Sequence, residues 1–305
     1  MSVDQINAIT QKKFIPKLYD NIFDSNVLLK KMKEGDGYDK VDGGSDLNFP
    51  LEYAQTSSAG TYSGADLLST TDNDSFTAAV YQWKQYYANI SITGIDKAKN
   101  QGDSQVIDFV KSKTQNAEKT LAQLLGDGLY SNGTDSKSLV GLRYAVANTN
   151  TIGGISQSSY SWWNCQKDSS TTTLSLAAMQ AIDNSATIDN DSPTLITCTR
   201  AIYNSYWALL QPQQRFQDSK TADAGFQNLM FNGKPVVVDS KCPTSHMFFH
   251  NMKYMKIKAH KDFDMKFMPF VQPINQDIQS AKVLWYGALG YSNLRMIGAL
   301  TAITG

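Results

Sequence analysis

The stretch VYQWKQYYANISITG, residues 80–94, decides how this chain folds, because its polarity pattern changes in the middle. From Tyr86 to Ile92 every second residue is apolar, which is the period of a half-buried β-strand. Tyr81 and Trp83 have the opposite parity from Tyr86, so one flat strand would carry large aromatic side chains on both faces. A single strand with one buried face therefore does not account for both halves.

A second strand-like run, LNFPLEY, precedes this stretch at residues 47–53. The residues between the two runs, 54–76, are mostly small, polar and typical of turns. This pattern predicts one very long hairpin. A connection of this length without its own secondary structure is uncommon inside a compact domain and usually serves a function outside it.

The clearest helix of the sequence is predicted over residues 104–125. Val110, Ala117 and Leu121 contribute to one apolar stripe, and Gly126 and Gly128 are expected to end the helix. At 1.5 Å per residue this helix would be roughly 33 Å long.

Beyond this helix the pattern is mixed α and β. The sequence predicts two helices with threonine caps, after Thr173 and Thr199, and a strand between them at 194–199. Asn232 and Gly233 lie between two strand-like runs and predict a hairpin turn. Four more strands are predicted towards the C-terminus, in HMFFHN, MKIKAH, KVLWYGAL and RMIGALTAI.

The composition narrows the class of protein. There are 28 Lys plus Arg and 28 Asp plus Glu, so net charge gives no reason to expect electrostatic wrapping of nucleic acid. Charged residues make up 18% and aromatic residues 11%, a mixture that suits buried intersubunit surface as well as an ordinary polar globular protein. The three widely spaced cysteines favour free thiols, and no signal peptide or membrane span is expected.

Searches for catalytic, cofactor and metal motifs find none that we interpret as a site. Gly233 and Lys234 lack the earlier glycine of a phosphate-binding loop, since Asn228 occupies its position. His246 and His250 fall in a predicted strand, where a spacing of four separates them by about 13 Å, so we expect a packed or solvated pair. We predict no catalytic residue, no cofactor and no metal.

The order of these parts resembles the tailed-bacteriophage major capsid protein family, which has the Hong Kong 97-type capsid fold. Individual stretches also look like members of that family: KFIPKLYDNIFDSNVLLKKM, TYSGADLLSTTDNDSFTAAVYQWKQYYANISITGIDKAKNQGD, LVGLRYAVA and LWYGALGYSNLRMIGALTAIT. The resemblance covers essentially the whole chain. Each of these motifs is weak by itself, and the resemblance rests on their order along the chain.

The resemblance implies an α+β fold with four parts. Residues 1–45 would form an N-terminal arm and 46–93 an extended hairpin called the E-loop. Residues 94–135 and 245–305 would form a peripheral domain with a spine helix at 104–125, and 136–244 a mixed α/β axial domain. The tip half of the opening stretch would lie over a neighbouring subunit, with a β-bulge at the change of parity.

The resemblance also implies a function. The chain would be a structural major capsid protein, not an enzyme, whose pentamers and hexamers form an icosahedral shell around double-stranded viral DNA. Expected partners are further copies of itself, a portal and a scaffolding protein, with decoration proteins optional, and DNA bound without sequence specificity. Because Met1 is followed almost directly by the arm, we expect the scaffolding protein to be a separate chain. The virion would be its location, after assembly in the host cytoplasm without a membrane.

Two alternatives stay open. The first is a nanocompartment shell of the encapsulin type, which would hold a cargo enzyme. The second is a soluble enzyme of unfamiliar type, which the missing motifs disfavour.

Aromatic residues of the predicted E-loop are the candidate intersubunit contacts: Tyr53, Tyr62, Phe76, Tyr81 and Trp83. We expect Trp83→Ala to weaken assembly while the subunit fold stays largely intact. Some members of the resembled family join subunits by an isopeptide bond from an E-loop lysine. Here no lysine occurs between Lys40 and Lys84, so we predict a shell without such cross-links.

Overall fold

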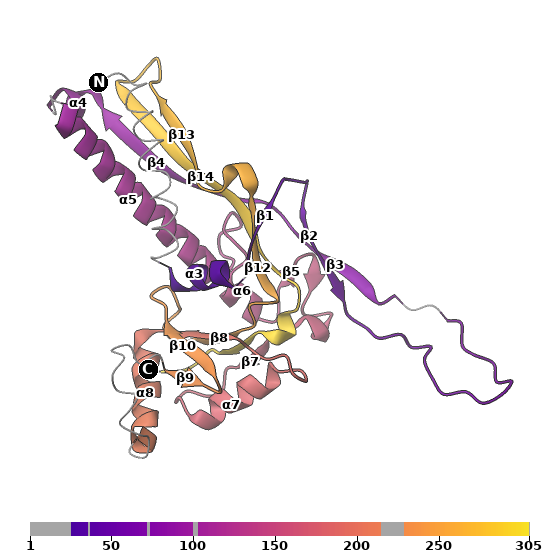
Figure 1. The fold of residues 1–305 in the computed structure, drawn as a ribbon. Helices are drawn as coiled ribbons and strands as arrows, with labels where there is room; N and C mark the ends of the chain where they lie inside the picture. The colour runs from indigo at the N-terminus through magenta and orange to yellow at the C-terminus, as the bar shows by residue number, and fades with distance from the viewer. Residues whose placement is uncertain (1–25, 36, 72–73, 100–102, 215–228, 305) are drawn as a thin grey trace.

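The computed structural model describes residues 26–35, 37–71, 74–99, 103–214 and 229–304 (Figure 1). Its helices are α3 (Val27–Glu34), α4 (Gly94–Lys99), α5 (Asp103–Leu129), α6 (Leu142–Val146), α7 (Leu176–Ser185) and α8 (Arg200–Gln214). Three short 3₁₀ turns are η1 (Ser161–Trp163), η3 (Lys261–Phe263) and η4 (Leu294–Met296).

A five-stranded sheet forms the upper part of the molecule. Its strands are β1 (Tyr38–Val41), β12 (Met255–His260), β14 (Ile278–Tyr291), β13 (Lys266–Val271) and β4 (Lys84–Thr93). The long strand β14 is central: its first part pairs antiparallel with both β4 and β13, and its last part pairs with β12. The helix α5 runs along β4 and packs against this sheet (Figure 1).

A six-stranded sheet lies in a second lobe. Its order is β7 (Gln166–Asp168), β15 (Gly298–Leu300), β11 (Met247–His250), β8 (Leu195–Cys198), β10 (Lys234–Val238) and β9 (Met230–Phe231). The helices α7 and α8 lie in the same lobe (Figure 1). A small hairpin of β5 (Thr151–Ile152) and β6 (Ile155–Ser156) completes the strands of the two lobes.

Each lobe has its own apolar core. The larger core joins α3, α5 and the five-stranded sheet, and includes Met32, Leu121, Ile90, Val283 and Trp285. The smaller core joins α7, α8 and the six-stranded sheet, and includes Met179, Ile202, Ile196, Phe249 and Leu300. Burial of these side chains is the main source of stability for each lobe.

The hairpin of β2 (Leu47–Glu52) and β3 (Phe76–Tyr81) projects from the body of the molecule. Its two strands pair antiparallel, from Leu47 opposite Tyr81 to Glu52 opposite Phe76. Of the connecting loop, residues 53–71 and 74–75 are described, and the loop extends far beyond both lobes (Figure 1). A long hairpin is therefore present as predicted, but its second strand is Phe76–Tyr81, and most of the predicted second strand, 80–94, belongs to another sheet.

The change of parity in residues 80–94 has a different cause from the predicted bulge. The strand β3 ends at Tyr81 and β4 begins at Lys84, and the two strands belong to different sheets. Two residues between them are enough to rotate the chain, so Tyr81 and Tyr86 each face a buried side of their own sheet. The second half of the stretch rejoins the subunit body by pairing with β14, as predicted.

The long helix is longer than predicted. It spans Asp103–Leu129 and continues through Gly126 and Gly128. These glycines allow close packing: a Cβ on Gly126 would lie 2.2 Å from the Asn26 amide nitrogen, and one on Gly128 would lie 2.5 Å from the Tyr86 hydroxyl. The two glycines therefore allow Asn26 and Tyr86 to approach the helix closely, and the helix ends at Leu129, one residue after Gly128.

The other helices and strands predicted between residues 173 and 305 are present, but the predicted cap at Thr173 is wrong: α7 begins at Leu176, and the Ser175 hydroxyl accepts from the Ala178 amide. The lobes also divide the chain differently from the predicted domains. The strands β11 and β15 lie in the six-stranded sheet, although the resemblance places residues 245–305 in the other domain. Buried residues from Leu139 to Cys165 pack in the larger core rather than the smaller one. In the predicted arm, α3 and β1 also belong to the larger lobe, while residues 1–25 lie outside the described part of the chain.

The two histidines of β11 and the turn before it are packed residues. His250 is fully buried, and its Nε2 lies 2.7 Å from the Thr197 hydroxyl. Burial lowers the pKa of His250 to about 3, and burial lowers the pKa of His246 to about 4. Both imidazoles are therefore neutral at pH 7. The cysteines Cys165, Cys198 and Cys242 are free and buried.

Candidate intersubunit surface

The base of the projecting hairpin is anchored in its own subunit by two aromatic residues. Phe49 and Tyr81 are 4% and 3% exposed, and their rings meet edge to face with centroids 5.3 Å apart. The Tyr81 hydroxyl donates to the Tyr291 carbonyl at 3.2 Å and accepts from the Tyr291 amide at 3.0 Å. Burial raises the pKa of Tyr81, so it stays protonated.

Lys258 and Gly290 also lie next to the Phe49 ring. The Lys258 ammonium lies 3.9 Å from the centroid of the Phe49 ring and donates to the Asn48 carbonyl at 2.9 Å. Burial lowers the pKa of Lys258. A Cβ on Gly290 would lie 2.3 Å from the Phe49 ring, so only glycine allows the ring to approach β14 this closely.

Two further contacts fix the direction in which the hairpin leaves the body. The Trp83 indole nitrogen donates to the Gly44 carbonyl at 2.9 Å, and the Val80 amide donates to the Gly153 carbonyl at 2.9 Å. Gly153 has a φ of 59°, and a Cβ there would lie 2.6 Å from the Cβ of Ala79. These contacts hold the base of the hairpin against the larger lobe.

Contact with the body continues as far as the start of the loop. The Tyr53 ring stacks on the Trp162 ring, with centroids 5.1 Å apart and planes 17° apart. Tyr53 is still 37% exposed, and its amide donates to the Ser75 carbonyl at 3.0 Å, which closes the loop.

The far part of the hairpin carries large apolar side chains that its own subunit does not cover. Four residues form this set, which we call the tip residues; Tyr62 is 66% exposed, Leu67 102%, Leu68 61% and Phe76 75%. Hydrogen bonds in the loop are local, such as Ser63 amide to Asp66 carboxylate at 2.9 Å. Exposed apolar groups concentrated on one segment are typical of a surface that another chain covers.

The five predicted contact residues separate into two groups. Tyr62 and Phe76 are exposed on the loop and at the strand end, and Tyr53 is partly covered by Trp162. Tyr81 is buried in its own subunit, so for this residue the prediction is wrong, and Trp83 is half-buried against its own subunit. The pattern of β3 puts Tyr81 on the inward face because it pairs with Leu47 at the base.

Leu67 and Leu68 were missed by the sequence reasoning. Two adjacent leucines in a loop of otherwise small and polar residues were the available signal. A turn-rich segment with no strand or helix pattern has no buried face of its own for such a pair.

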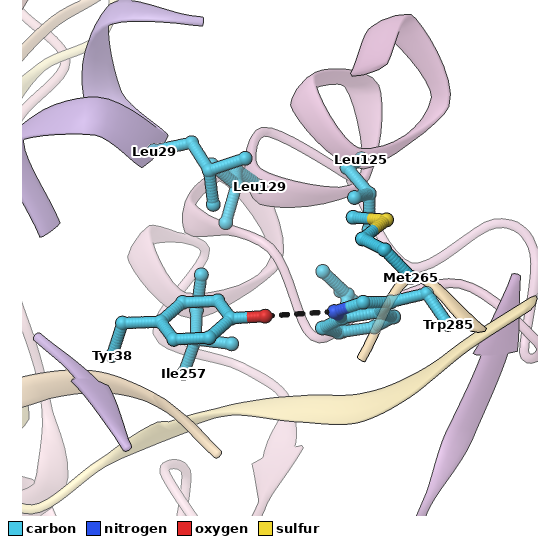
Figure 2. Close-up of a pocket in the computed structure, with 8 residues that line it drawn as sticks. Leu29, Tyr38, Leu125, Leu129, Ile257, Met265 and Trp285 are labelled. Atoms are coloured by element: carbon cyan, nitrogen blue, oxygen red, sulfur yellow. Dashed lines mark hydrogen bonds between the residues drawn. The ribbon is translucent and has the colours of Figure 1, made fainter. Parts of the chain in front are cut away.

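An apolar enclosure between α3, the end of α5 and the five-stranded sheet is packed core and not a binding site. Figure 2 shows side chains from α3, β1, the end of α5, β12 and β14 converging there, with Tyr38 and Trp285 joined by a hydrogen bond of 3.0 Å. The side chains that line this enclosure leave no space the size of a water molecule between them. These contacts therefore hold α3 and β1 against α5, β12 and β14.

Comparison with known proteins was made by sequence and by structure. No family model and no curated protein matches the sequence. The capsid chain of cyanophage A-1(L) matches with a TM-score of 0.68 at 16% identity, over 88% of this chain and 91% of that chain. The capsid chain of the native GTA particle matches with a TM-score of 0.63 at 9% identity, over 88% of both chains.

The chain has the Hong Kong 97-type fold. The SrpI encapsulin of Synechococcus elongatus also matches, with a TM-score of 0.56 at 8% identity, over 88% of this chain and 85% of that chain. Phage capsids and an encapsulin shell therefore share the Hong Kong 97-type fold with this protein, which is mixed α and β. Among the described residues, no helix combines the length and apolar character needed to cross a membrane.

Proposed function

We propose that this protein is a major capsid protein that assembles into pentamers and hexamers of an icosahedral shell around double-stranded viral DNA. The observation that carries this proposal is the projecting hairpin whose tip residues are exposed although its base is buried. Each large side chain contributes roughly 1.5 to 3 kcal/mol if a neighbouring subunit buries it fully. The Hong Kong 97-type fold supports the same conclusion.

We assign the parts of the fold accordingly. The hairpin of β2 and β3 with its loop is the E-loop, α5 is the spine helix, and the lobe of the five-stranded sheet is the peripheral domain. The lobe of the six-stranded sheet is the axial domain, which includes β11 and β15 in our assignment. No residue has a catalytic role in this proposal.

The proposed partners follow from assembly of a shell. Copies of the chain contact each other, and a separate scaffolding protein, a portal and decoration proteins act with them. Packaged DNA meets the shell without sequence specificity, since 28 basic and 28 acidic residues balance. The mature location is the virion, after assembly in the host cytoplasm.

A nanocompartment shell is the second candidate, because the SrpI encapsulin chain matches over 88% of this chain. The two candidates differ in what the shell encloses. Native particles should be purified, treated with nuclease and then opened. Protected double-stranded DNA supports the capsid, whereas a co-purified enzyme without DNA supports the nanocompartment. Absence of any particle larger than a small oligomer, by electron microscopy and size-exclusion chromatography, contradicts both.

A mature shell of this protein should lack E-loop isopeptide cross-links. Residues 41–83 contain no lysine and no cysteine, so the loop has neither the amine nor the thiol for a covalent bond to a neighbour. Particles boiled in denaturing detergent should give one band near the monomer mass of 33.7 kDa. A ladder of covalent pentamers and hexamers would show this prediction to be wrong.

A further inference from the structure

The dipeptide Asn-Gly occurs twice in the chain, at Asn132-Gly133 and at Asn232-Gly233. In such a pair the amide carbon of the asparagine side chain lies close in sequence to the backbone nitrogen of glycine. Because glycine has no side chain, little hinders the approach of these two atoms to each other. The structure places the two pairs in very different surroundings, which gives the two asparagines different chemical reactivity.

The first pair lies in an exposed turn between α5 and α6. Asn132 is exposed, and its side-chain Oδ1 accepts two hydrogen bonds from Thr134, from the hydroxyl at 2.7 Å and from the backbone amide at 3.2 Å. Both donors polarise the side-chain carbonyl group and make its Cγ more electrophilic. They also lie where they would stabilise negative charge on Oδ1, as the donors of an oxyanion hole do.

The nitrogen atoms of this first pair are only lightly held. The Gly133 amide donates to the Ser131 hydroxyl at 3.1 Å, and this hydrogen bond has to break before the nitrogen can turn towards Cγ. Within the described part of the chain, no hydrogen bond holds the Asn132 Nδ2. The nitrogen that would attack and the nitrogen that would leave are therefore both accessible to reaction.

The second pair is held firmly. Asn232 and Gly233 form the two-residue turn between β9 and β10, and the pairing of these strands fixes the backbone on both sides. The Asn232 Nδ2 donates to the Gln180 Oε1 at 2.8 Å and to the Asp183 Oδ2 at 3.1 Å. Two hydrogen bonds thus hold the side-chain amide of Asn232, and none of the described residues donates to its Oδ1.

We propose that Asn132 is a site of spontaneous deamidation in the folded protein and that the fold protects Asn232. In the first step the Gly133 nitrogen loses its proton to solvent and bonds to the Asn132 Cγ. The bond from Cγ to Nδ2 breaks, and this nitrogen takes up a proton from solvent and leaves as ammonia. The cyclic imide then takes up one water molecule and opens to aspartate or to isoaspartate, in which the backbone runs through Cγ.

Deamidation changes the charge and the geometry of this turn. It adds one negative charge, and isoaspartate adds one atom to the backbone before Gly133. Gly133 has a φ of 78° and lies against the Tyr144 ring of α6, while the Lys84 ammonium of β4 donates to the Ser136 carbonyl at 2.6 Å. The turn is therefore packed against both elements, and the modified turn has to change these contacts.

Peptide mapping by mass spectrometry tests the proposal. The folded full-length protein is incubated at mildly alkaline pH in water labelled with heavy oxygen, so that each deamidation event incorporates the label. Labelling at residue 132 should be at least about tenfold faster than at residue 232, because two hydrogen bonds hold the Asn232 amide. Equal rates at the two sites, or a faster rate at residue 232, overturn the proposal.

The denatured protein is the control for the effect of neighbouring residues in the sequence. In concentrated urea both pairs lose their hydrogen bonds, so the two labelling rates should become similar. A rate difference that is as large in urea as in the folded protein would come from the flanking sequence, and it would overturn the structural explanation.

Two variants of the full chain test the hydrogen bond to Oδ1. Thr134→Ser keeps a hydroxyl group and should be labelled at residue 132 like the natural protein. Thr134→Val removes the hydroxyl with little change of shape and should slow labelling about fivefold. Equal rates in the two variants would show that the hydroxyl has no such role.

Thr134 is exposed, so both variants should fold, and circular dichroism with thermal melting checks this. If either variant does not fold, the comparison of the two sites in the natural protein decides. The reaction needs only the folded subunit, so these measurements do not depend on assembly. Failure of this inference therefore leaves the proposed shell function standing.

Discussion

The base and the tip of the projecting hairpin carry the same kinds of side chain in opposite surroundings. Phe49 and Tyr81 at the base are 4% and 3% exposed, whereas Tyr62 and Phe76 towards the tip are 66% and 75% exposed. The pairing of β2 with β3 is continuous from one region to the other. Strand pairing therefore extends beyond the subunit's own core, so the far end of the hairpin is exposed on the isolated subunit.

The largest expected effect on subunit stability is that of Phe49→Ala. This change removes a buried ring that contacts Tyr81 and Lys258, and should lower the free energy of unfolding by about 3 to 5 kcal/mol. Urea denaturation of isolated subunits measures it. Phe76→Ala is the matched control, because it removes the same side chain where it is exposed. Equal destabilisation by both changes would remove the distinction between base and tip.

Trp83→Ala should destabilise the subunit, in contrast to what the sequence alone suggested. The half-buried indole packs on the larger core and donates to the Gly44 carbonyl, so its removal should cost about 2 kcal/mol of unfolding free energy. Thermal or urea unfolding of the subunit tests this. An unchanged unfolding free energy together with weakened assembly would restore the original interpretation and move Trp83 into the group of tip residues.

A smaller change at the base separates hydrogen bonding from packing. Tyr81→Phe keeps the ring against Phe49 and removes the hydroxyl that bonds to the Tyr291 amide and carbonyl. The buried Tyr291 amide then loses its partner, which should cost about 1.5 kcal/mol. The loss should appear in the urea midpoint with an unchanged slope. A neutral result would mean that ring packing alone holds the base.

Much of the fold could be predicted from the sequence because local patterns agree with the final structure. Alternation from Tyr86 onward identified most of β4, and the strand-like run LNFPLEY identified β2. The Asn232-Gly233 pair identified the turn between β9 and β10, where both residues have positive φ. Threonine after a strand likewise identified the start of α8, since the Thr199 hydroxyl accepts from the Ile202 amide at 3.4 Å.

The predictions that were wrong share a physical reason, which is that distant contacts decide them. Gly126 and Gly128 do not end the helix. They are glycines because Asn26 and Tyr86 occupy the space that a side chain at these positions would fill. Likewise, β11 and β15 join the six-stranded sheet by pairings with β8 and β7 that no local pattern reports. Alternation around Tyr81 could show that one face is buried, but not which chain buries it.

Changes at the tip should have the smallest effect on the unfolding free energy of the subunit. They therefore test most sharply the difference between the base and the tip of the hairpin. Replacing Tyr62 and Phe76 together by serine removes two exposed rings that make no packed contact with the core of their own subunit. The unfolding free energy of isolated subunits should therefore change by only about 0.5 kcal/mol or less.

Assembly should respond very differently to the same pair of changes. If a neighbour buries both rings, the contact loses roughly 1.5 to 3 kcal/mol for each, repeated at every contact of the ring. The subunit concentration needed for capsomers, measured by light scattering and electron microscopy, should rise by at least about tenfold. Tyr160→Ser is the control, since Tyr160 is 52% exposed on the subunit body and lies outside the loop. Unchanged assembly in the loop variant would mean that the tip stays uncovered in the shell, and that the hairpin projects for some other purpose.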